Sequence, residues 1–122
     1  MEKIKKYIDT IVSQYKDVKN DMENYFFKYN FEDFLSTKAE KYYKTDELYS
    51  FFSNIQLYIA DITKEELVEY LETTKKGFEK ARLTNNPINF STNPMTNMVR
   101  LWNFEVYAEL IKQIDIILCR YC

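Results

Sequence analysis

Histidine is absent from the 122 residues of this chain. That absence removes the commonest metal ligand of proteins and the usual general base at neutral pH. It also excludes every catalytic pair in which a histidine activates a serine or a cysteine. The chain has no glycine-rich phosphate loop, nucleophile elbow or kinase signature either. We therefore expect a protein that is not an enzyme.

Glycine and proline are scarce, with one glycine and two prolines in the whole chain. A β-fold with many tight turns needs more of both, whereas long helices exclude them. Hydrophobic residues make up 46% of the chain, and its length is that of one domain with a buried core. The composition predicts an all-α fold over residues 1–122, a single-domain antiparallel bundle of about four main helices.

The chain also lacks a long uninterrupted hydrophobic run. Charged residues interrupt its first segment, "MEKIKKYIDTIVSQYKD", every few positions. A membrane span or a signal-peptide core needs roughly 15 to 20 apolar residues in a row. We expect a cytoplasmic protein that does not contact a membrane.

The two cysteines, Cys119 and Cys122, form a single C-x-x-C at the end of the last predicted helix. A zinc site needs two further ligands, and a redox motif normally occupies the start of a helix. We expect neither a metal nor a cofactor, and the redox state of the pair is left open.

Hydrophobic residues recur at spacings of three and four and predict four helices. The first carries an apolar stripe from Ile4 to Tyr29, and the second covers 37–60, with a break near Thr45. The third opens at a capping box, Thr63 with Glu66, and bends at Gly77. The last begins with Asn93 as N-cap and Pro94 in the first turn. Its predicted buried stripe contains Val99, Trp102, Val106, Leu110, Ile114, Ile117 and Tyr121.

The connector before the last helix lies within "LTNNPINFSTNPM", residues 83–95. It is longer than most connections in helical bundles. It also contains Ile88 and Phe90, which a fully solvated loop does not need. Two interpretations stay open: the two side chains fold back onto the end of the bundle, or the loop recognises a partner.

Charge is unevenly distributed along the chain. Residues 45–72 contain seven acidic side chains and one basic side chain, whereas the net charge of the whole protein is −2. Such a segment repels phosphate and attracts basic surfaces, and mainly raises the rate of association. A nucleic-acid-binding protein needs the opposite pattern, and the one basic stripe (Lys75, Lys76, Lys80 and Arg82) is short. We expect a protein partner and no nucleic acid.

Tyrosines accompany the acidic segment, and tyrosine is enriched at protein interfaces. A solvated helix of the same composition gives the same pattern, so the two interpretations remain open. Carboxylates near a helix start also complement the helix dipole, without any ligand. The residues that we predict to contact a partner are Asp46, Glu47, Tyr49, Asp61, Glu65, Glu66, Glu69, Glu72, Ile88 and Phe90.

In these features the chain resembles the small bacterial immunity proteins that neutralise toxins of contact-dependent inhibition and related systems. The shared features are the short chain, the acidic segment from Asp46 to Glu72, the tyrosines and the lack of catalytic parts. The resemblance rests on no shared motif, so it transfers no residue. It implies a cognate toxin as partner, such as a basic nuclease. Two alternatives have the same features: a phage or mobile-element inhibitor of a host defence enzyme, and a structural or sensor bundle that forms a homodimer.

Overall fold

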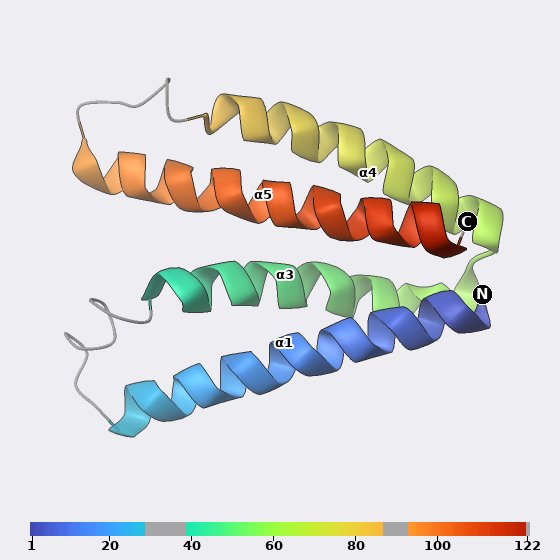
Figure 1. Cartoon of the computed structure of the whole chain (residues 1–122), viewed down its shortest axis with the longest axis horizontal. Coiled ribbons are helices and arrows are strands. Elements are labelled where there is room, and N and C mark those ends of the chain that lie inside the picture. The colour runs from blue at the N-terminus through green and yellow to red at the C-terminus, as the bar shows by residue number, and fades with distance from the viewer. Residues whose placement is uncertain (29–38, 87–92, 122) are drawn as a thin grey trace. The chain divides into compact units, whose positions relative to one another are not determined.

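The computed structural model describes residues 1–28, 39–86 and 93–121 (Figure 1). The described part is all-α, as predicted, with no strand in it. The main helices are α1 (Glu2–Lys28), α3 (Ala39–Tyr58), α4 (Lys64–Thr84) and α5 (Pro94–Tyr121), and a short 3₁₀ helix, η1 (Ile59–Asp61), follows α3. No helix in the described ranges is both long enough and apolar enough to cross a bilayer.

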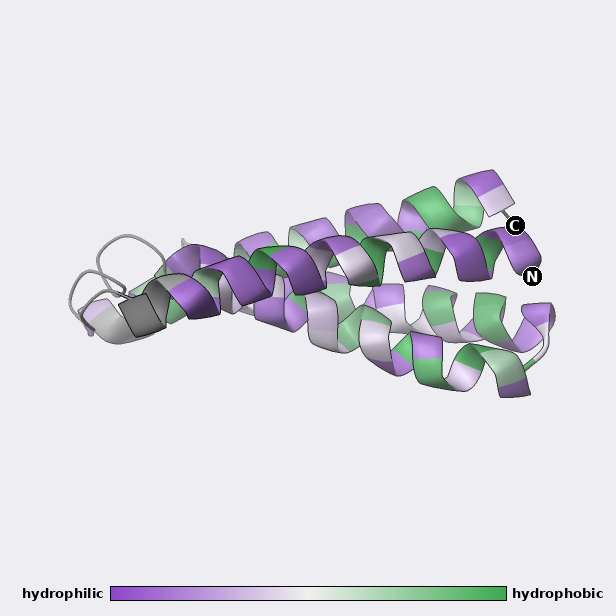
Figure 2. Cartoon of the chain, turned by 90° about the horizontal axis from the view of Figure 1, so that it is seen from below, coloured by the Kyte–Doolittle hydropathy of each residue, from purple (hydrophilic) through white to green (hydrophobic). Residues whose placement is uncertain are grey.

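The helices group into two compact units, Glu2–Ala60 and Asp61–Cys122. Each unit is built on one antiparallel helix pair, α1 with α3 and α4 with α5 (Figure 1). Hydrophobic and hydrophilic residues are interspersed along every helix (Figure 2).

Contacts between α1 and α3 define one antiparallel register. Tyr15 stacks on Phe52, with ring centroids 6.5 Å apart. Near the start of α1, Asp9 accepts a 2.7 Å hydrogen bond from Gln56. Since the residue numbers of the paired positions rise in α1 as they fall in α3, the two helices run side by side over their described length. The predicted stripe of α1 and one face of α3 and η1 form the core of this unit, with these side chains buried: Ile4, Ile8, Ile11, Met22, Leu48, Phe52, Ile55 and Ile59.

The second pair, α4 and α5, is held in the same way. Leu67 and Leu71 of α4 are fully buried, as are Ile114 and Ile117 of α5. Phe78 packs against Tyr107, with ring centroids 5.4 Å apart. The predicted stripe of α5 is buried at Val106, Leu110, Ile114 and Ile117, whereas Trp102 and Tyr121 are half-buried. Val99 differs, because 40% of its surface is exposed.

Both predicted helix starts in this unit are confirmed. The Thr63 hydroxyl accepts a hydrogen bond from the backbone of Glu66, whose carboxylate accepts one from the backbone of Thr63. Asn93 caps α5 by accepting a bond from the Thr96 backbone N–H, and Pro94 occupies the first turn. These caps satisfy donors that a helix start otherwise leaves without partners.

One predicted boundary is wrong. Thr45 does not break α3, which is continuous from Ala39 to Tyr58, and Thr45 itself is buried. The segment Thr45-Asp46-Glu47 has the composition of a helix start, but contacts with α1 hold it inside the helix. Gly77 lies within α4, which continues to Thr84. The start predicted for the second helix at residue 37 lies outside the described residues.

Candidate functional site

The predicted partner-binding residues fall into three places in the structure. Asp46, Glu47 and Tyr49 are on α3, in the first unit. Asp61 is the last residue of η1. The other four acidic residues are on α4, and Ile88 and Phe90 lie outside the described residues.

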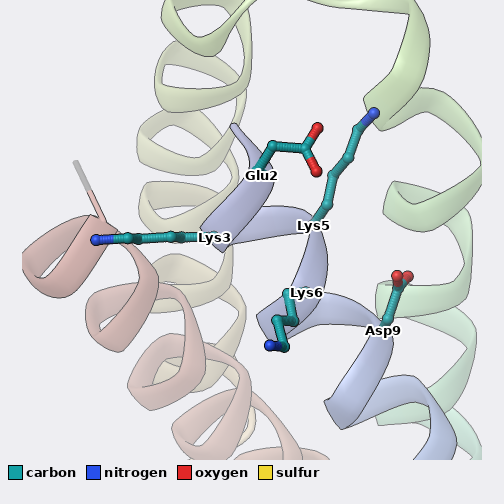
Figure 3. A pocket seen from close by; sticks show the side chains of 5 residues that line it. All are labelled: Glu2, Lys3, Lys5, Lys6 and Asp9. Atoms are coloured by element: carbon teal, nitrogen blue, oxygen red, sulfur yellow. The ribbon is translucent and has the colours of Figure 1, made fainter.

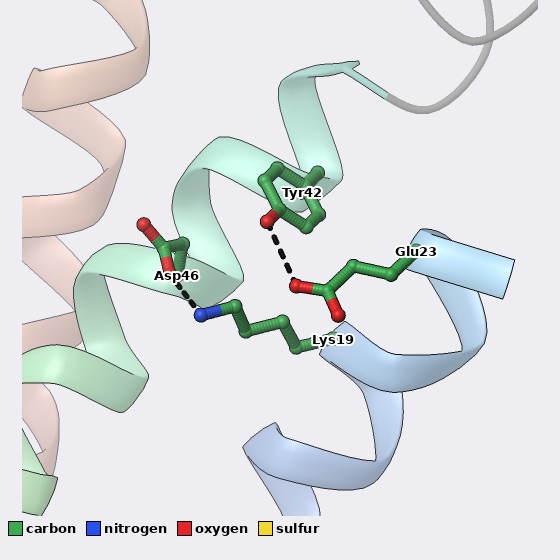
Figure 4. A network of polar contacts seen from close by, with 4 residues as sticks. All are labelled: Lys19, Glu23, Tyr42 and Asp46. Carbon is green, nitrogen blue, oxygen red and sulfur yellow. Dashed lines mark hydrogen bonds and ion pairs between the residues drawn. The ribbon is translucent and has the colours of Figure 1, made fainter. Parts of the chain in front are cut away.

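Asp46 is engaged by a cation of its own chain. Its carboxylate lies 2.7 Å from the Lys19 ammonium of α1 (Figure 4). The same ammonium lies 5.1 Å from the centroid of the Tyr49 ring. One turn further along, the Tyr42 hydroxyl donates a 3.0 Å hydrogen bond to Glu23. These interactions connect α1 to α3, so two of the predicted binding residues also hold this helix pair together.

The electrostatics of this connection predict sensitivity to alkaline pH. The hydrogen bond to Asp46 raises the pKa of Lys19 above its ordinary value. Burial, and then the bond to Glu23, raise the pKa of Tyr42. A group whose pKa is raised by folding stabilises the fold below its unfolded pKa, and this contribution is lost as the pH rises through the folded value. Loss of the proton from Lys19 or from Tyr42 therefore lowers the stability of the α1–α3 pair as the pH rises.

We expect the melting temperature to fall as the pH rises past the ordinary pKa values of tyrosine and lysine, near 10. Because Tyr42→Phe removes one of the two titrating groups, this variant should lose less stability than wild type over that range. Thermal melts followed by circular dichroism at a series of pH values measure the difference. Equal losses in the two proteins would show that Tyr42 does not contribute.

On α4, three glutamates share one face. Glu65, Glu69 and Glu72 are spaced four and three residues apart, and all three are exposed. We call them the α4 glutamate row. None of them has an ion pair or a hydrogen bond with another described residue. Together with Lys64 and Val68 they line an open hollow on the helix surface. Glu66 is exposed too, but its carboxylate is used in the cap of α4.

Three further exposed residues of α4 are not among those predicted to contact a partner. Tyr70 is 48% exposed and follows Glu69 directly. Its position beside the buried stripe, rather than in it, is the signal that predicts this exposure. Lys76 and Lys80 continue the face of the glutamate row toward the end of the helix, and both are exposed.

The basic stripe predicted from the sequence is divided between two environments. Lys75 lies 2.6 Å from Asp115 of α5, and that hydrogen bond raises the pKa of Lys75. The guanidinium of Arg82 lies 4.3 Å from the centroid of the Phe104 ring. These two cations hold α4 to α5, which leaves Lys76 and Lys80 on the exposed face.

A second hollow, at the start of α1, has mixed charge. It is lined by Glu2, Lys3, Lys5, Lys6 and Asp9. Figure 3 shows the three lysine side chains pointing in different directions, so they do not converge on one ligand. Asp9 is also bonded to Gln56.

A metal site is not found in the described part of the chain, where no three Cys, Asp or Glu side chains come together to hold an ion. Cys119 is an exposed thiol near the end of α5, and Cys122 lies outside the described residues. No protein-family model, curated protein or solved structure matches the chain.

Proposed function

We propose that this protein is a non-catalytic inhibitor that binds a basic protein through the α4 glutamate row, and that its partner is the toxin that it neutralises. The observation that carries the proposal is the exposure of Glu65, Glu69 and Glu72 on one helix face, without an ion pair or hydrogen bond to another residue that the structure describes. Charges arranged in this way are solvated in the free protein and available to a complementary surface.

Local helix energetics explain only part of the α4 glutamate row. Carboxylates in the first turns of a helix interact favourably with its dipole, which explains Glu65. However, Glu65 and Glu69 are four residues apart and Glu69 and Glu72 are three apart, spacings at which like charges repel. The favourable interaction with the helix dipole therefore does not account for all three glutamates. Val68, which is half-buried among them, adds apolar contact area.

The length of the α4 glutamate row limits the size of the basic surface that it can match on a partner. Lys76 and Lys80 follow on the same face, so the acidic part spans only residues 65–72. At 1.5 Å per residue this is about 10 Å along the helix. A short cluster of lysines or arginines on the partner matches this length. A longer basic groove would also lie against Lys76 and Lys80, which repel it. The exposed ring of Tyr70 lies about 100° around the helix from Glu69, so it is not part of the row.

The proposal is tested by capture of the partner. Tagged protein is mixed at low ionic strength with a lysate of the source organism, washed, and eluted with high salt. We expect one basic protein in nearly equal amount in the eluate, identified by mass spectrometry. Recovery of this protein alone, at low salt and from cells that express the toxin, would contradict the proposal. The identity of the captured protein distinguishes a toxin from a host defence enzyme.

A further inference from the structure

We infer that the outer face of α4 binds the same face of a second copy of this chain, in an antiparallel arrangement. The face contains Glu65, Glu69, Glu72, Lys76, Lys80 and Leu83, at spacings of three and four, all of them exposed. Its first half is acidic and its second half is basic. Because two antiparallel copies place opposite halves against each other, the face is complementary to itself, as a twofold interface requires.

The positions of the charged residues along α4 agree with this antiparallel arrangement. A twofold axis at the level between Thr74 and Lys75 places Glu69 of each copy level with Lys80 of the other. The same axis brings Glu72 within about 1.5 Å of the level of Lys76 of the other copy. At 100° per residue, Glu69 and Lys80 lie about 40° and 60° from Glu65, on the same side of the face. Residues on the same side face each other across a twofold axis, so the pair of Glu69 and Lys80 forms twice.

Apolar contacts accompany the ends of this charged region. Leu83 is 66% exposed, although it is a large aliphatic side chain. In the same register it comes within about 3 Å of the level of Val68 in the second copy. Two such contacts, one at each end, add buried apolar area to the charged contact. The 21 residues of α4 give a contact about 30 Å long.

Two features keep the association weak. Glu79 lies at the edge of the same face and meets Glu72 of the second copy, a like charge. The ion pairs are also exposed, so salt screens them. This self-association does not depend on the proposed function, although it covers Glu69 and Glu72 and would compete with a basic partner.

The test is a charge swap at Glu69 and Lys80. Within one helix these residues are about 16 Å apart, beyond the screening length of about 8 Å at physiological salt, so they do not interact directly. Glu69→Lys or Lys80→Glu alone places like charges together twice, and we expect either change to weaken self-association by about tenfold. The double variant restores opposite charges, and we expect it to associate within about threefold of wild type.

Sedimentation equilibrium of the full chain at low salt measures the association, and circular dichroism confirms that each variant is folded. Asp21→Lys and Lys16→Glu, exposed reversals on α1, serve as controls that should leave the association unchanged. A wild type that stays monomeric at its highest soluble concentration would overturn the inference. So would single reversals that leave the dimer intact, or a double variant that fails to restore it. None of these outcomes affects the capture experiment.

Discussion

Replacing Phe52 by alanine is expected to lower the free energy of unfolding by about 3–5 kcal/mol. Phe52 has no exposed surface, and its ring contacts both Tyr15 of α1 and Phe51 of its own helix. The substitution leaves a cavity between two long helices, which are held apart by their other side chains and do not collapse into it. The loss is a large share of the 5–15 kcal/mol that stabilises a typical domain.

The same helix provides a matched control for this prediction. Leu57 is 71% exposed, and Leu57→Ala should change the free energy by no more than about 0.5 kcal/mol. Urea unfolding followed by circular dichroism measures both variants. A loss below about 1 kcal/mol for Phe52→Ala would show that the α1–α3 pair is not packed around this ring.

Reversal of the α4 glutamate row is expected to weaken binding of the basic partner by about a hundredfold at low salt. Glu65→Lys, Glu69→Lys and Glu72→Lys together replace attraction with repulsion at three exposed positions. The buried stripe of α4, which includes Leu67 and Leu71, is untouched, so the variant should stay folded. Titration calorimetry with the purified partner measures the affinity.

A control with the same change of charge separates the site from the total charge. Glu2, Asp17 and Asp21 are exposed acidic residues of α1, and reversing them also changes the net charge from −2 to +4. We expect this variant to bind within about threefold of wild type, because long-range attraction alone changes affinity little. Equal losses in the two triple variants would mean that binding follows net charge rather than the α4 face.

The sequence predicts the parts of this fold that depend on local interactions. The caps at Thr63 and Asn93 involve residues three positions apart, so their chemistry is visible in the printed sequence. The buried stripes follow from helical spacing over most of their length. At Val99 the stripe fails although this position shares a helix face with Val106. Arg82 of α4 already lies against Phe104, and α4 ends at Thr84, so Val99 lies past the end of the helix with which α5 pairs.

Features that depend on distant residues were not predictable in the same way. The pairing of Lys19 with Asp46 depends on the register of α1 against α3, which no local pattern specifies. The same pairing explains why Thr45 and Asp46 continue a helix although their composition favours a helix start. It also shows why a count of charges along the chain overstates the acidity of residues 45–72, since Asp46 is paired with a lysine from outside that segment.

The most direct test of the central proposal is the rate of association with the captured partner as a function of ionic strength. For wild type, we expect the association rate to fall at least tenfold from low to high salt, with a nearly constant dissociation rate. For the Glu65, Glu69 and Glu72 reversal variant, the rate should stay level or rise, because salt then screens repulsion. A wild-type rate that does not change with salt, or the same dependence in both proteins, would contradict docking through the α4 glutamate row.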